Sequence, residues 1–176
     1  MLPTLDARLS AAAELVRPGE PVADIGCDHG KLTAVLAASG KYPKVIGADL
    51  RPGPLAKAEQ TLEHAGCKDR AELRLGDGLS VLTENEVGNI VLAGVSAQTT
   101  WEILEKAPWV FTVGGPRIIM IPATRHDALR RWLWEHGFSF AADRPVQAAG
   151  RCNREGGHSA QESVVTVFHS GEKWRD

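Results

Sequence analysis

Short apolar runs that end in glycine or aspartate alternate with helical patterns along most of this chain. Residues 21–26, 44–49 and 89–94 are such runs, and residues 31–39 and 54–65 have the periodicity of helices. Runs that are apolar on both faces are typical of parallel strands in a sheet that helices cover on both sides. The alternation therefore predicts an α/β fold.

The predicted sheet has seven strands, most of them parallel. The other strands are expected at residues 71–75, 117–122, 138 onward and 163–169. The other helices are expected at residues 5–16, 99–106 and 125–136. No helical pattern separates the last two extended segments, which are joined by a loop rich in glycine and charge. The last strand is therefore expected to run antiparallel.

The length of the chain, 176 residues, is enough for one domain with one sizeable core. We expect residues 1–176 to form a single domain, with the helix of residues 1–17 packed on it. Hydrophobic residues make up 43% and charged residues 24% of the chain, as in folded globular proteins. The formal net charge of −2 excludes a strongly basic nucleic-acid coat.

The sequence indicates neither a membrane protein nor a secreted one. No apolar run approaches the roughly 20 residues that cross a bilayer, and the first residues lack the apolar stretch of a signal peptide. The three cysteines, Cys27, Cys67 and Cys152, have no CxxC spacing, so neither a disulfide framework nor a metal site is expected. A reducing, cytoplasmic environment fits these features best.

Acidic residues and glycines stand at the ends of four predicted strands. Residues 24–30 (DIGCDHG) follow the first strand, and Asp49 ends the second. Residues 76–78 (GDG) follow the third strand, and Gly94 ends the fourth. In an open α/β sheet, ligands bind beyond the carboxyl ends of the strands. These residues therefore mark a candidate ligand site.

The first of these segments has the pattern D-x-G-x-D-x-G. A dinucleotide fingerprint, G-x-G-x-x-G, would need glycine where the chain has Asp28, whose carboxylate disfavours a pyrophosphate. The chain also lacks a P-loop. The pattern instead resembles motif I of class I S-adenosylmethionine (SAM) methyltransferases, with Asp28 in place of the middle glycine. A sulfonium and a zwitterionic tail tolerate carboxylates, and Gly26 lets the backbone approach the ligand closely.

For this ligand, the residues at the strand ends have separate expected roles. Asp49 can accept both ribose hydroxyls, Asp77 can accept the exocyclic amine of adenine, and Gly94 leaves room for the methionine portion. Taken singly, each could be an ordinary turn or cap residue. Because all four segments occur in the order that a SAM site requires, the set favours SAM binding. The residues expected to bind the cofactor are Asp24, Gly26, Cys27, Asp28, Asp49, Leu50, Asp77, Gly78 and Gly94.

Several segments together match one protein family. They are Leu9-Ser10, residues 23–29, residues 47–49, residues 53–55, Ala58, residues 74–79, Ala93-Gly94, residues 129–133 and Gly137-Phe138. With these segments, roughly residues 5–140 resemble the TrmK-like bacterial tRNA (adenine-22-N1)-methyltransferases. The resemblance implies a Rossmann-like class I methyltransferase fold with helices on both faces of the sheet. It also implies SAM as methyl donor and N1-methylation of an adenine in tRNA.

Two loops depart from the pattern of that family. Residues 94–97 (GVSA) stand where the family usually has G-M-G-G, and residues 121–123 (IPA) where it usually has Q-P-N. The chain is also expected to lack the helical extension that the family carries after the catalytic domain, thought to help grip RNA, because Asp176 comes too early for one. A catalytically weakened SAM-binding or interaction module, or a methyltransferase with another substrate, is therefore the alternative. A serine hydrolase at Ser96 is disfavoured because the closing glycine of G-x-S-x-G is absent.

Asp28 is the first candidate for a catalytic group, and His29 is the second. Methylation of adenine N1 gives a cationic product, so a carboxylate beside the ring would stabilise the developing charge or accept a proton from the exocyclic amine. The adenine would have to be unpaired or flipped out of its helix. For His29 the alternative is a structural hydrogen bond to the backbone at the start of the next helix.

Arginines are concentrated in the second half of the chain, where an arginine-rich rim could meet RNA phosphates. An ordinary solvated surface is the alternative. These arginines are Arg117, Arg125, Arg130, Arg131, Arg144, Arg151 and Arg154.

Overall fold

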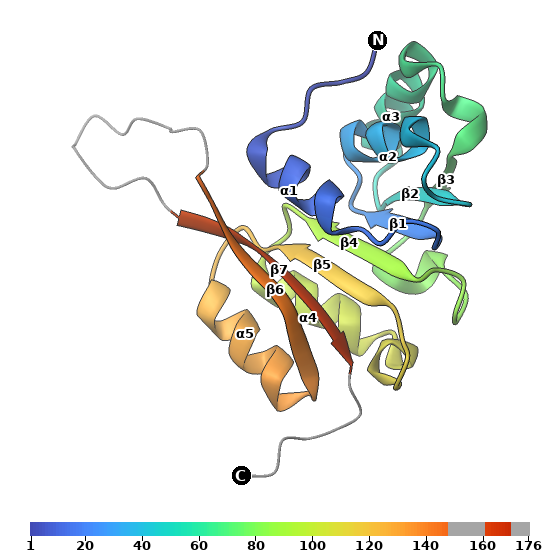
Figure 1. The fold of residues 1–176 in the computed structure, drawn as a ribbon. Coiled ribbons are helices and arrows are strands. Elements are labelled where there is room, and N and C mark those ends of the chain that lie inside the picture. The colour runs from blue at the N-terminus through green and yellow to red at the C-terminus, as the bar shows by residue number, and fades with distance from the viewer. Residues whose placement is uncertain (148–160, 170–176) are drawn as a thin grey trace.

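The computed structural model describes residues 1–147 and 161–169 and shows one twisted sheet with helices on both faces (Figure 1). The strand order in the sheet is β3-β2-β1-β4-β5-β7-β6. The strands are β1 (Val22–Ile25), β2 (Val45–Asp49), β3 (Glu72–Leu75), β4 (Asn89–Ala93), β5 (Arg117–Ile121), β6 (Phe138–Gln147) and β7 (Gln161–His169). The pairs among β1 to β5 are parallel, whereas β7 is antiparallel to both β5 and β6.

Five α-helices of the described residues cover the sheet. They are α1 (Ala7–Leu15), α2 (Lys31–Ser39), α3 (Pro52–Ala65), α4 (Ala97–Glu105) and α5 (His126–Glu135). Helices α1, α2 and α3 lie on one face, and α4 and α5 lie on the other (Figure 1). The predicted α/β fold, with a parallel sheet between two helical layers, is therefore confirmed. Three short 3-10 helices were not predicted: η1 (Lys68–Arg70), η2 (Gly78–Val81) and η3 (Pro108–Phe111).

The central strands are buried on both faces, which explains their continuous apolar sequence. In β1, Ala23 and Ile25 belong to the core under α4 and α5, whereas Val22 belongs to the core under α1, α2 and α3. Side chains alternate along a strand, so the same alternation brings Asp24 to the face that α2 covers. Burying each large aliphatic side chain contributes about 1.5–3 kcal/mol, so these two cores fix the strands that carry the strand-end residues.

Side-chain caps set two helix boundaries that differ from the predicted ones. The helix expected from residue 5 begins at Ala7, because the Asp6 carboxylate accepts a hydrogen bond from the Leu9 N–H at 2.9 Å. The helix expected from residue 99 begins at Ala97, because Ser96 Oγ accepts one from the Thr99 N–H at 3.0 Å. Ser96 is therefore used as a helix cap.

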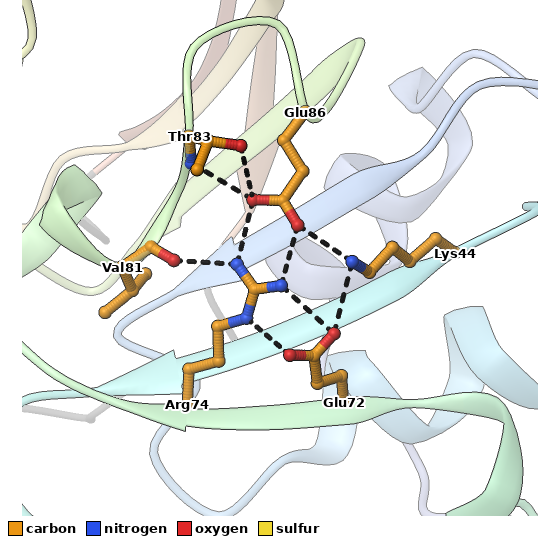
Figure 2. Close-up of polar contacts among 6 residues, drawn as sticks. All are labelled: Lys44, Glu72, Arg74, Val81, Thr83 and Glu86. Atoms are coloured by element: carbon orange, nitrogen blue, oxygen red, sulfur yellow. Dashed lines mark hydrogen bonds and ion pairs between the residues drawn. The ribbon is translucent and has the colours of Figure 1, made fainter.

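A network of charged side chains fixes the connection between β3 and β4 (Figure 2). The Arg74 guanidinium donates to both carboxylate oxygens of Glu86, at 2.6 and 2.9 Å, and to the Val81 carbonyl at 2.7 Å. Glu86 also accepts the Thr83 N–H at 3.1 Å. Val81 is the last residue of η2, which begins at Gly78. Arg74 therefore holds η2 against β3.

The same network reaches across to β2. Lys44 precedes β2, and its ammonium lies 2.8 Å from a carboxylate oxygen of Glu86 and 3.2 Å from one of Glu72 (Figure 2). The side chains of Arg74 and Glu86 are 20% and 15% exposed, so water screens their ion pair less than it screens a surface pair. The hydrogen bonds from Arg74, followed by that from Lys44, hold the pKa of Glu86 well below its usual range.

Replacing Glu86 with glutamine is expected to lower the free energy of unfolding at pH 7 by about 1–3 kcal/mol, because Arg74 keeps its burial but loses one of its two carboxylate partners, Glu72 being the other. The carboxylate stabilises the fold above its unfolded pKa near 4.5, and this contribution is lost as the pH falls toward the depressed native pKa. Urea unfolding at pH 7 and pH 3 should therefore show a difference that shrinks in acid. Glu84→Gln, an exposed neighbour, should change stability by less than about 0.5 kcal/mol. Equal effects of the two variants would contradict this role.

Candidate functional site

A cavity of about 570 Å³ opens at the carboxyl ends of the central strands. This volume is typical of a pocket for a small-molecule ligand. Every residue expected to act at the site lines it: Asp24, Gly26, Cys27, Asp28, His29, Asp49, Leu50, Asp77, Gly78 and Gly94. The structure thus brings together four chain segments that are separated by up to 70 residues in the sequence.

The loop after β1, whose residues 26–29 line the cavity, contains three residues with positive φ. Gly26, Asp28 and Gly30 have φ values of 75°, 50° and 69°. A Cβ on Gly30 would stand 2.7 Å from the Cβ of Ala58 in α3. The last position of the motif must therefore be glycine for the loop to lie against α3. Asp28 takes the left-handed conformation despite its side chain, at a cost of order 1 kcal/mol.

The carboxylate of Asp49 connects the loop after β1 to the loop after β2. Its Oδ2 accepts the Asp28 N–H at 3.1 Å, and its Oδ1 accepts the Arg51 N–H at 2.9 Å. Asp49 is only 6% exposed, yet it lines the cavity. Each carboxylate oxygen has a further lone pair, so Asp49 can accept two more hydrogen bonds from a ligand.

Asp24 is a second buried carboxylate beneath the cavity. It is 2% exposed, and its Oδ2 accepts a hydrogen bond from Thr33 Oγ1 at 2.6 Å. Burial raises the pKa of Asp24 from 3.8 to about 6. Burial, followed by the nearby carboxylates of Asp24 and Asp49, also raises the pKa of the Cys27 thiol far above its ordinary value. Cys27 therefore stays protonated and is no nucleophile.

The rim of the cavity combines an apolar side chain with an accessible carboxylate. The side chain of Leu50 is exposed, as is that of Asp77, whose carboxylate accepts a hydrogen bond from Lys106 Nζ at 3.0 Å. An apolar surface close to a hydrogen-bond acceptor suits a flat heterocycle that carries an amino group.

Asp28 and His29 face the cavity and do not cap the next helix. The N-cap of α2 is Gly30, with no side-chain hydrogen bond, so the alternative of a capping role for either residue is wrong. The His29 ring Nε2 lies 3.7 Å from an Asp28 carboxylate oxygen, and both side chains are about half exposed. Both are therefore accessible to a molecule at the mouth of the cavity.

Some cavity residues were not predicted from the sequence. Helix α1 contributes Asp6, Arg8 and Leu9, and α4 contributes Thr99 and Ile103. Asp6 and Arg8 form an ion pair at 3.0 Å. Their one sequence signal was polar residues at the start of an amphipathic helix, and nothing local shows that this end of the helix reaches the cavity.

The expected rim of arginines is only partly present. Arg130 pairs with Asp143 at 2.9 Å, Arg144 pairs with Glu14 at 3.2 Å, and Arg117 donates to a backbone carbonyl. These three side chains hold elements of the fold together. Arg151 and Arg154 lie outside the described residues, as does Cys152. Arg125 and Arg131 are exposed.

Two further absences concern the described part of the chain. None of its helices has both the length and the apolar composition needed to cross a membrane. None of its histidine, cysteine and acidic side chains are grouped so that they could hold a metal ion.

Comparison with known proteins identifies the class of protein to which this chain belongs. Residues 5–153 match a family model described as a methyltransferase domain. The chain therefore belongs to the methyltransferase-domain family.

Within that class, the chain is similar to particular tRNA methyltransferases. It is 29% identical over 148 residues to the tRNA (adenine(22)-N(1))-methyltransferase of Bacillus subtilis, covering 84% of this chain and 62% of that protein. A candidate tRNA (m1A22) methyltransferase of Streptococcus pneumoniae, solved in complex with S-adenosyl-L-methionine, superposes with a TM-score of 0.83 at 28% identity over 95% of this chain and 74% of that one. The Bacillus subtilis m1A22 tRNA methyltransferase TrmK superposes with a TM-score of 0.82 at 26% identity. The match covers 96% of this chain and 67% of that one.

These comparisons confirm the resemblance to the TrmK-like family. The chain spans less than two thirds of the length of the Bacillus subtilis relative that it matches in sequence.

The raised pKa of Asp24 predicts a pH dependence of stability. The native protein binds this proton more tightly than the unfolded chain, so stability is lost as the pH rises from 3.8 to about 6. Asp24→Asn keeps an acceptor for Thr33 and removes the ionisation. The free energy of unfolding of the variant, minus that of the wild type, should therefore rise by about 2–3 kcal/mol between pH 4 and pH 7. Chemical denaturation across this range measures it, and a constant difference would contradict the raised pKa.

Proposed function

We propose that this chain is a SAM-dependent methyltransferase that methylates N1 of an adenine in tRNA. The observation that carries the proposal is the convergence of Asp24, Asp28, Asp49 and Asp77 on one cavity at the ends of β1, β2 and β3. SAM carries a sulfonium group and a zwitterionic amino-acid tail, so its net charge is positive and a cavity with several carboxylates complements it. The proposal treats residues 1–176 as one domain, with a seven-stranded sheet whose last strand is antiparallel.

The residues around the cavity fit SAM part by part. Asp49 would accept the two ribose hydroxyls with the lone pairs that its backbone partners leave free. Leu50 would pack on the adenine ring, and Asp77 would accept its exocyclic amine, sharing its carboxylate with Lys106. The methionine portion would lie over Gly26 and Gly94, both of which have positive φ.

Asp24, Cys27 and Gly78 complete the proposed cofactor site. Asp24 lies beneath the position proposed for the methionine portion, where an ammonium would favour its ionised form. Cys27 contributes a small neutral side chain. A Cβ on Gly78 would lie 3.0 Å from Ile103, so a side chain at this position would narrow the cavity.

The chemistry assigned to the protein is alignment and charge stabilisation. When bound, SAM supplies a methyl group already activated by its positive sulfur. Asp28 would stabilise the positive charge that develops on the adenine ring, or accept a proton from its exocyclic amine. His29, whose ring lies near the Asp28 carboxylate, would hold that carboxylate or replace it in this role. The adenine must leave its helix to reach this position, where the bound cofactor and adenine would displace water from the cavity.

Support for the tRNA substrate comes from the relatives, whose names state that activity at 26–29% identity. A cytoplasmic location follows if tRNA is the substrate, and the free, buried Cys27 and Cys67 accord with a reducing compartment. The alternatives are a SAM-binding module without activity and a methyltransferase with another substrate. Incubating the protein with labelled SAM and unmodified tRNA, followed by nucleoside analysis, separates them. The proposal expects label in 1-methyladenosine, whereas SAM binding without transfer would favour the inactive module.

Asp49→Asn is expected to weaken SAM binding about 10- to 100-fold, because one acceptor oxygen becomes a donor and the charge is lost. Isothermal titration calorimetry measures this affinity, and thermal unfolding checks that the variant folds. Asp69→Asn, an exposed carboxylate outside the cavity, serves as the control and should bind SAM like the wild type. An unchanged affinity in Asp49→Asn would show that the ribose does not contact Asp49.

Asp28→Asn is expected to lower the rate of methyl transfer about 10²- to 10⁴-fold, the range for loss of a general acid–base group. Asparagine tolerates the left-handed conformation of this position, so the loop should keep its shape. SAM affinity should change much less than the rate, which single-turnover transfer and calorimetry measure separately. If affinity and rate fall by the same factor, Asp28 is a cofactor-binding residue and not a catalytic one.

A further inference from the structure

The pair Trp101–Arg125 lies beside the loops that follow β4 and β5, and the function proposed so far does not use it. The Arg125 guanidinium carbon stands over the Trp101 ring, 6.0 Å from the ring centroid. We propose that Arg125, held by Trp101, binds a phosphate of the RNA strand at the acceptor side of the cavity. This inference rests on the proposed function and extends it to the grip on the substrate.

The backbone places Arg125 beside the cavity. The Ala123 N–H donates to the Val95 carbonyl at 2.9 Å, which joins the loop after β5 to the loop after β4. Val95 lines the cavity, and so does Thr99 on α4, the helix that carries Trp101. Helix α5 begins directly after Arg125, at the edge of the sheet where the parallel strands end (Figure 1).

Trp101 limits the movement of the Arg125 guanidinium and leaves the N–H donors of that guanidinium unused. The Trp101 ring is half-buried and packs against the core under α4 and α5, so its own position is fixed. A cation–π contact leaves the N–H edge of the guanidinium free for a ligand. Arg125 is exposed, and no carboxylate of the described residues forms an ion pair with it. Arg130, one turn further along α5, differs because Asp143 already occupies its fork.

The backbone at Arg125 is unfavourable for arginine. Its φ and ψ are 56° and 45°, the left-handed region, and its side chain makes no cap hydrogen bond to α5. Glycine or asparagine takes this conformation at lower cost, and asparagine is also among the best N-cap residues. The demands of the fold therefore do not explain an arginine here, whereas the demands of a phosphate ligand do.

A phosphate of RNA is the ligand that this group suits. The planar guanidinium donates two parallel hydrogen bonds to phosphate oxygens, which gives both affinity and orientation. The loop before Arg125 contains Pro122, Ala123 and Thr124, so Arg125 carries the only charge there. A nucleotide flipped into the cavity keeps its phosphates at the mouth, where such a donor can hold the strand.

The test measures tRNA affinity against salt concentration for the wild type, Arg125→Gly and Arg70→Ala. Arg125→Gly should bind unmodified tRNA about tenfold more weakly, and the slope of log affinity against log salt should fall in magnitude by about 1. Because glycine relieves the backbone strain, its melting temperature should equal or exceed that of the wild type. Arg70→Ala removes an exposed arginine of η1 that does not line the cavity, and it should leave affinity, slope and melting temperature unchanged.

The outcomes separate this inference from the proposed function. If the wild type methylates tRNA, and Arg125→Gly binds tRNA with the affinity and salt slope of the wild type, the inference is overturned and the function stands. If Arg125→Gly loses stability and keeps its tRNA affinity, the Trp101 contact is structural only, which also overturns the inference. SAM affinity should be equal in all three proteins. If the wild type neither binds nor methylates RNA, the proposed substrate fails and this inference fails with it.

Discussion

The carboxylate of Asp49 is the interaction on which the site depends. It is buried at the end of β2, where the Asp28 and Arg51 N–H groups each donate to one of its oxygens. One of these bonds holds the loop after β1 in a conformation that includes a non-glycine residue with positive φ. The carboxylate proposed to bind the ribose therefore also positions Asp28, the residue proposed for catalysis.

The charge of the cavity gives it a chemical preference. Asp24, Asp28 and Asp49 all line it, and burial, followed by the charges of these three carboxylates, raises the pKa of the Cys27 thiol. The first of these carboxylates is itself held only weakly in its ionised form, since burial raises its pKa to about 6. A cationic ligand would offset these repulsions, whereas an anionic pyrophosphate would add to them. The electrostatics therefore agree with the absence of a dinucleotide fingerprint from the sequence.

Much of the fold could be predicted because its signals are local. The apolar strands, the glycines that end α2 and α3 and the polar strand ends all lie within short windows, and parallel strands place their carboxyl ends at one edge. Sequence patterns therefore placed Asp49, Asp77 and Gly94 at one edge of the sheet, where all three line the cavity, but they did not show the hydrogen bonds made there.

The rest depends on contacts distant in sequence. Arg8 lies at the cavity only because α1 packs over it, and Arg130 is engaged only because β6 brings Asp143 beside it. The sequence placed Arg130 in the expected rim and gave no sign of Arg8, because composition alone does not show which arginine meets the cavity and which one pairs with a carboxylate of the fold. Helix starts at Ala7 and Ala97 were likewise set by caps that periodicity does not reveal.

The most direct test is a crystal structure of the chain with S-adenosylhomocysteine, the demethylated form of SAM. The account predicts density in the cavity at the ends of β1, β2 and β4, with both ribose hydroxyls within hydrogen-bond distance of the Asp49 carboxylate and the adenine against Leu50. It also predicts that the sulfur points toward the side of Asp28. A ligand bound elsewhere on the molecule, or one whose ribose lies away from Asp49, would contradict the account.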